Sequence, residues 1–165
     1  MKLVLLLALL STTLALFPNH LKSVIKGIAT SLNFKDKPDK LAECIGDESI
    51  ESWDWFHEVL KEKNGDKKED VLLRLSAFIT PVVDTFIRIY GCSESSVQEV
   101  MEEIVIKSSY AEGLMQKFYE HIDKIKKNLN TINEEWEKKK FEEIGEAVGK
   151  IIKDIFYDES FDIDH

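Results

Sequence analysis

Apolar residues recur at helical spacing along most of this chain. Between residues 21 and 32 they stand at i, i+3, i+4, i+7, i+8 and i+11, which is typical of one face of an amphipathic helix. These positions hold Leu21, Val24, Ile25, Ile28, Ala29 and Leu32. Pro18 and Asn19 are expected to open this helix, and residues 34–38 to close it. With only 7 glycines and 3 prolines in 165 residues, the chain favours helices over turn-rich sheets.

Two further helices are predicted before residue 64. Pro38 suits the first turn of a short helix that carries Leu41 and Cys44 and ends at Gly46. The next helix begins near residues 47–49. Its apolar side holds Ile50, Trp53, Phe56, Val59 and Leu60. Residues 64–66 (Asn-Gly-Asp) indicate a stop, and residues 67–70 are interpreted as a charged linker.

The segment 71–90 has almost no polar face, so we expect it to form the centre of the bundle. Pro81 removes one backbone hydrogen bond and should bend this helix. The charged residues Arg74, Asp84 and Arg88 favour a soluble core helix over a membrane span. Gly91 is expected to cap its C-terminus.

The C-terminal half predicts three more helical stretches. Their apolar positions are Val97, Val100, Met101, Ile104 and Val105; then Leu114, Phe118, Ile122, Ile125, Leu129 and Ile132; and finally Phe141, Ile144, Val148, Ile151, Ile152 and Ile155. Trp136 lies about 140° around a helix from Phe141, so the last two stretches do not share one face. Asn130 and Asn133 are good capping residues, and we predict a break between them. The fold class is therefore all-α, a single-domain bundle of five to six helices over residues 16–157.

The N-terminus has the pattern of a secretory signal. Lys2 is followed by an apolar run and then by small residues, with Thr13 and Ala15 suited to cleavage after Ala15. The run is short for a membrane span, although an uncleaved anchor is the alternative. We expect residues 1–15 to be a signal peptide, the protein to be secreted or lumenal, and no stable membrane span to remain after cleavage. Residues 158–165 form an acidic tail.

The composition is that of a globular, acidic protein. Hydrophobic residues make up 44% and charged residues 32%, with a net charge of −9, or −10 once Lys2 is removed. Such a charge disfavours contact with phosphate backbones, so no nucleic-acid partner is expected.

Two cysteines, Cys44 and Cys92, remain in a compartment expected to be oxidising. A disulfide between them would close a loop of 48 residues and stabilise the fold by about 4 kcal/mol by the chain-entropy relation. The alternative is a pair of buried thiols. A catalytic pair is disfavoured because the chain has no C-x-x-C motif.

A few residues are candidates for contact sites. Gly145 and Gly149 are four apart and predict close helix packing, either inside the core or in a dimer. Trp55 and Trp136 are candidate contacts for a partner or ligand, because exposed tryptophans are enriched at binding surfaces. Trp53 and Trp55 cannot share one helical face, so at least one of them should be partly exposed.

The chain offers no pattern for catalysis or metal binding. It lacks a G-x-S-x-G turn, a phosphate loop and an H-E-x-x-H pair. The histidines His20, His57, His121 and His165 are scattered, and the acidic tail lacks the geometry of a calcium loop. We therefore expect no enzymatic activity, no cofactor and no metal site.

The chain resembles the small, secreted, all-helical proteins of unknown function predicted from ciliate genomes. The resemblance rests on residues 25–28 (Ile-Lys-Gly-Ile), 90–92 (Tyr-Gly-Cys), 112–114 (Glu-Gly-Leu), 118–119 (Phe-Tyr), 144–145 (Ile-Gly) and 148–152 (Val-Gly-Lys-Ile-Ile), together with the signal pattern. It implies a helical fold and a secretory compartment, and no activity or site residue. Those proteins often carry more cysteines than the two present here.

Two functions are consistent with these features. The first is a secreted binding or structural protein that acts through contacts with a protein partner. The alternative is a carrier of a hydrophobic small molecule or lipid, with a cavity opened at the Pro81 bend and lined by Met101, Met115 and aromatic residues. A fully packed core would exclude the carrier.

Overall fold

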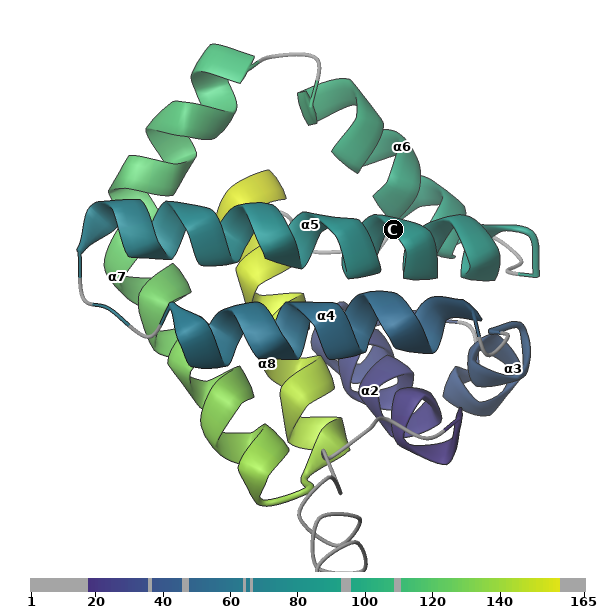
Figure 1. Cartoon of the computed structure of the whole chain (residues 1–165). Coiled ribbons are helices and arrows are strands. Elements are labelled where there is room, and N and C mark those ends of the chain that lie inside the picture. Colours follow the sequence, from purple (N-terminus) through teal and green to yellow (C-terminus); the bar gives the residue numbers. More distant parts are fainter. Residues whose placement is uncertain are drawn as a thin grey trace, which may run out of the picture.

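The structure is a computed structural model that describes residues 18–35, 37–45, 48–63, 65, 67–92, 96–108 and 111–157. Within these ranges the chain forms seven helices and no strand, which confirms the all-α prediction (Figure 1). The predicted number of helices, five to six, is too low. The helices are α2 (Pro18–Ser31), α3 (Pro38–Glu43), α4 (Glu48–Glu62), α5 (Lys68–Tyr90), α6 (Ser96–Ser108), α7 (Ala111–Glu137) and α8 (Phe141–Phe156). The predicted signal segment 1–15 and the acidic tail 158–165 lie outside the described residues. None of the described helices is long and apolar enough to cross a membrane.

The centre of the bundle is α8. Its most extensive contacts are with α2 and α7, and residues from Phe141 to Ile155 are buried on it. The prediction that residues 71–90 form the centre is wrong. Helix α5 buries one side, which includes Phe78 and Phe86, but leaves Ile79 and Ile87 more than half exposed. The apolar residues of α5 therefore exceed what the core needs.

Glycines allow the backbones of α2 and α8 to touch. A Cβ atom added to Gly145 would fall on the carbonyl group of Val24 and 2.9 Å from the Cα of Gly27. A Cβ atom added to Gly149 would lie 2.5 Å from the Cβ of Ser31. The structure thus places both Gly145 and Gly149 against α2 of the same chain.

Helices α4 and α5 form a hairpin that crosses α7 and α8 (Figure 1). Two side-chain hydrogen bonds join them: the Trp53 indole Nε1 donates to Thr85 Oγ1 at 3.0 Å, and Ser49 Oγ donates to Asp84 Oδ2 at 2.6 Å. The prediction of a charged linker over residues 67–70 is wrong for residues 68–70, which belong to α5, and holds only for Lys67. Helix α5 begins at Lys68, where Glu69 and Asp70 in the first turn suit the helix dipole.

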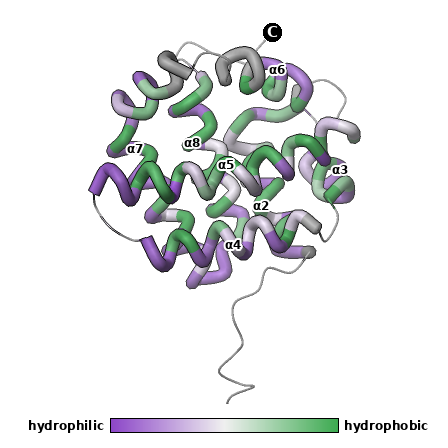
Figure 2. Tube along the Cα trace, turned by 45° about the horizontal axis from the view of Figure 1, so that its top comes forward, coloured by the Kyte–Doolittle hydropathy of each residue, from purple (hydrophilic) through white to green (hydrophobic). Residues whose placement is uncertain are grey.

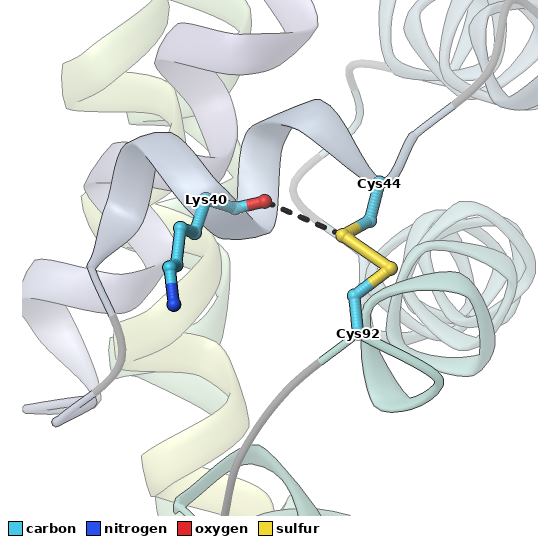
Figure 3. The surroundings of a disulfide bond; sticks show 3 residues. All are labelled: Lys40, Cys44 and Cys92. Atoms are coloured by element: carbon cyan, nitrogen blue, oxygen red, sulfur yellow. Dashed lines mark hydrogen bonds between the residues drawn. A yellow bond between two sulfur atoms is a disulfide. The ribbon is translucent and has the colours of Figure 1, made fainter.

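The predicted disulfide is confirmed and joins Cys44, at the end of α3, to Cys92, two residues after α5 (Figure 3). The two Cα atoms are 6.2 Å apart, within the usual range. The Cys44 Sγ also lies 3.3 Å from the carbonyl oxygen of Lys40. Because the bond encloses α4 and α5, it holds both ends of that hairpin against the short helix α3.

Helix α7 runs unbroken through the position of the predicted break between Asn130 and Asn133, so that prediction is wrong. Asn130 does not cap a helix; its Oδ1 accepts a hydrogen bond at 2.7 Å from Nη1 of the buried Arg74. The chain turns instead after Glu137, where Lys139 adopts a positive φ of 58°. Trp136 and Phe141 flank this turn with ring centroids 6.1 Å apart. The apolar face of the chain therefore changes direction between α7 and α8 at this turn, not within α7.

Alanine at Gly145 tests the contact between α2 and α8. We expect Gly145→Ala to lower the free energy of unfolding by about 1–3 kcal/mol, the usual cost of overpacking, even though alanine is the better helix former. Gly91→Ala is the matched control, because the nearest atom to its added Cβ is the Arg88 carbonyl oxygen at 3.8 Å. Urea denaturation followed by circular dichroism measures both variants. A Gly145→Ala protein as stable as the wild type would contradict the close crossing.

Candidate functional site

An apolar pocket with a volume of about 270 Å³ lies among α5, α6, α7 and α8. Helix α5 supplies most of its wall. The lining residues are Leu72, Leu75, Ser76, Phe78, Ile79, Val82, Val83 and Phe86 of α5, Met101 and Ile104 of α6, Met115 and Phe118 of α7, and Ile155 and Phe156 of α8. We refer to this site as the apolar pocket.

The pocket reaches the surface at one side. Ile79, Val83 and Met115 line it and are also exposed, by 51%, 40% and 44% respectively. In Figure 1, α6 and the first half of α7 both extend above α5, one over each end of it. Figure 2 shows apolar residues recurring along α5, α7 and α8. A ligand would therefore enter beside α5, between its exposed apolar residues and the start of α7.

The walls of the pocket offer no free polar group among the described side chains. Ser76 is the one polar lining residue, and its hydroxyl donates a hydrogen bond at 2.7 Å to the carbonyl oxygen of Leu73 in its own helix. A ligand group buried here would have to be apolar, because an unpaired polar group in such surroundings costs several kcal/mol. The volume exceeds the roughly 150 Å³ of an engineered cavity that accepts benzene.

The structure separates the predicted contact residues. Met101 and Met115 line the pocket together, on α6 and α7. Trp55 is exposed by 51% on α4 and takes no part in the pocket. Trp136 is fully buried, so its prediction as a partner or ligand contact is wrong; its indole stacks on His57 of α4.

The predicted opening at the Pro81 bend is met in part, because Ile79, Val82 and Val83 on either side of Pro81 line the pocket. Helix α5 continues through Pro81, which is buried and does not line the pocket. The residues that sequence reasoning missed are those of α5 itself, above all Ile79 and Val83. The signal for them is the nearly complete apolar surface of residues 71–90, a pattern that also predicts a central helix. The surplus apolar side of α5 forms the pocket wall and its mouth.

His57 is the second unusual group in the structure. Its imidazole is only 2% exposed and stacks on the Trp136 indole, with ring centroids 4.3 Å apart. Burial, with a smaller effect from Lys61, lowers the pKa of His57 to about 4. The Glu137 carboxylate would oppose this shift, but it is half exposed and its Oε1 stands 3.7 Å from His57 Nε2. His57 is thus a neutral packing residue at ordinary pH.

No group of three or more histidine, cysteine, aspartate or glutamate side chains is placed to hold a metal ion in the part of the chain that the structure describes. The acidic tail considered for calcium lies beyond it. The candidate site is therefore the apolar pocket.

Comparison of the chain with protein-family models, with curated proteins and with solved structures gives no match. The arguments for function accordingly come from the pocket and its surroundings.

The burial of His57 should make the folded protein less stable in acid. The unfolded chain has the higher pKa, 6.5 against about 4, so it binds the proton more readily between these values. The contribution of neutral His57 to the free energy of unfolding is complete above about pH 6.5. It is lost as the pH falls toward 4, and the total loss is about 3 kcal/mol.

Urea denaturation at several pH values between about 7.5 and 4 measures this loss. Carboxylates titrate over part of the same range, so His57→Gln is compared with the wild type, and its stability should fall less steeply with pH. His20→Gln is the control, since His20 is only half-buried and the pKa of its imidazole is lowered less by burial and by Lys139. If stability falls equally steeply with pH in the wild type and in His57→Gln, the burial of neutral His57 is not the cause of the acid sensitivity.

Proposed function

We propose that this protein binds a small hydrophobic molecule in the apolar pocket and serves as its carrier. The observation that supports this most is a cavity of about 270 Å³ in which the only polar side chain among the described residues is hydrogen-bonded to its own helix. Small-molecule sites are typically concave and largely apolar, with a volume of several hundred Å³. The pocket is slightly smaller than the roughly 300 Å³ at which that range begins, so it suits a compact ligand or a single hydrocarbon chain.

The pocket fits binding better than catalysis. A reaction site needs converging groups that move protons or stabilise charge, whereas the described walls carry aliphatic, aromatic and thioether side chains apart from Ser76. Methionines at two sides, Met101 and Met115, have flexible side chains that adapt to ligands of different shape. A ligand of about ten heavy atoms reaches a Kd on the order of micromolar if each atom contributes about 0.8 kcal/mol, which is within the range for small ligands.

We also propose that the protein works in an oxidising compartment, secreted or in the lumen of the secretory pathway. The disulfide between Cys44 and Cys92 supports this, because such bonds persist mainly there. The expected signal peptide points the same way. A soluble carrier is useful in such fluids, since hydrophobic molecules need a protein to keep them dissolved.

Filling the pocket tests the function. We expect N-phenyl-1-naphthylamine, a neutral probe that fluoresces in apolar surroundings, to bind the wild type saturably and to be displaced by 1-decanol. Val82→Phe places a larger ring in the pocket and should weaken binding of both at least tenfold. Val82 is buried and lines the pocket.

The matched control is Ile87→Phe on the same helix. Ile87 is 61% exposed and does not line the pocket, so this variant should bind as the wild type does. Thermal melts check that both variants are folded. Equal loss of binding in the two variants, or no saturable binding by the wild type, would contradict the carrier.

Contact with a protein partner is the second candidate function. It is favoured by an exposed apolar stripe on α5, formed by Ile79, Val83, Ile87 and Tyr90. Residues at these spacings share one side of a helix, and contiguous exposed apolar patches often mark interaction sites. The stripe continues from the mouth of the pocket, because Ile79 and Val83 belong to both.

Self-association through the stripe is the form of contact that can be tested with the protein alone. If the stripe pairs two copies, sedimentation velocity should show a dimer in the wild type and a monomer for Ile87→Lys. Thr80→Lys adds the same charge at an exposed polar residue of the same helix and should leave the dimer intact. A wild type that stays monomeric at 100 µM or so would count against this form of contact.

A further inference from the structure

The row of α5 residues at the centre of the pocket wall begins with a lysine. Leu72, Leu75, Ile79, Val82 and Phe86 follow Lys68 at intervals of four, three, four, three and four, which keeps all six on one side of the helix. Lys68 itself is exposed and lies one turn before Leu72, the first residue of α5 to line the pocket. Lys68 therefore places a positive charge one helical turn beyond the lining residues of α5.

A contact from α7 favours this position of the Lys68 ammonium. The Lys68 Nζ lies over the ring of Tyr119, 5.9 Å from its centroid. Tyr119 in turn packs edge-on against Phe118, with centroids 5.3 Å apart, and Phe118 lines the pocket. An ammonium over an aromatic face is attracted by the ring quadrupole, which favours this position over free solvent.

The neighbouring charged residues of α5, and Glu120 of α7, lie off this row or have other partners. The Asp70 side chain lies against Gly65, and the Arg74 guanidinium donates to Asn130 and to the Gly65 carbonyl oxygen. Glu69 is about 100° around the helix from Lys68. On α7, Glu120 accepts a hydrogen bond from Gln116 at 2.7 Å. Lys68 is thus the charged group of α5 that shares the central row of the pocket wall.

We propose that the natural ligand is an amphiphile with one aliphatic chain and a terminal carboxylate, a fatty-acid-like molecule. The chain occupies the apolar pocket, and the carboxylate stays at the surface beside the Lys68 ammonium. This inference rests on the proposed function and adds the chemical class of the ligand. A polar head could not be buried farther in, because the walls offer no free partner for it among the described side chains.

The experiment compares decanoate with 1-decanol, which have chains of the same length, at about pH 8 where the acid is ionised. Both are measured by displacement of N-phenyl-1-naphthylamine from wild type, Lys68→Met and Lys67→Met. Lys67 is also exposed and directly precedes α5, but it lies about 100° from Lys68, off the central row. It therefore controls for the loss of one positive charge from an acidic protein.

We expect Lys68→Met to weaken the binding of decanoate about two- to fivefold relative to the binding of 1-decanol. This factor corresponds to the interaction energies found for exposed ion pairs. The ratio of the decanoate affinity to the decanol affinity should stay unchanged in Lys67→Met. In the wild type, the preference for decanoate over decanol should shrink in high salt because salt screens the charges. Equal effects of the two lysine variants, or a decanoate-to-decanol ratio unaffected by Lys68→Met, overturn the carboxylate assignment while leaving the carrier intact. If neither decanoate nor decanol displaces the probe from the wild type, the carrier and the carboxylate fail together.

Discussion

The contact between α2 and α8 is the constraint on which the rest of the architecture depends. Gly27, Gly145 and Gly149 bring the two helices to backbone distance, so α8 is held on one side by α2 and on the other by α7. This geometry fixes the end of α8, where Ile155 and Phe156 form part of the pocket wall. A looser packing of α2 on α8 would shift that wall, and the shape of the pocket with it.

The second determinant is the excess of apolar residues on α5. One side of the helix is buried in the core, and the disulfide and the hydrogen bonds to α4 hold the hairpin in place. A helix fixed in this way cannot rotate to bury its remaining apolar side. Since that side is not fully covered by α6 and the start of α7, it is left as a pocket that opens onto an exposed stripe.

Much of the fold was predictable because the signals were local. The amphipathic spacing of residues 21–32, the proline at 38 and the pair of cysteines each determine a feature through nearby residues or simple chemistry. The errors came where a distant partner decides the outcome. Asn130 looked like a cap, but Arg74, which is 56 residues away in sequence, takes its side-chain oxygen. Trp136 looked accessible, but it packs against His57 of another helix.

The pocket could be predicted only in part, for a related reason. Met101 and Met115 were proposed as lining residues, yet the cavity depends on how far α6 and α7 stand from α5, which no local pattern encodes. The side of α5 that faces the pocket is apolar in the same way as the side that faces the core. Sequence patterns distinguish buried from exposed surfaces, but they do not distinguish a packed apolar surface from an empty one.

The most direct test of the account is a methyl-resolved NMR titration of the protein with 1-decanol. The chain has 3 methionines, and two of them, Met101 and Met115, line the pocket from different helices. The account predicts saturable shifts of both methyl signals and intermolecular contacts between each methyl group and the decanol chain. Signals that do not move at saturating decanol, or contacts confined to Met115 at the mouth, would contradict a ligand seated in the pocket.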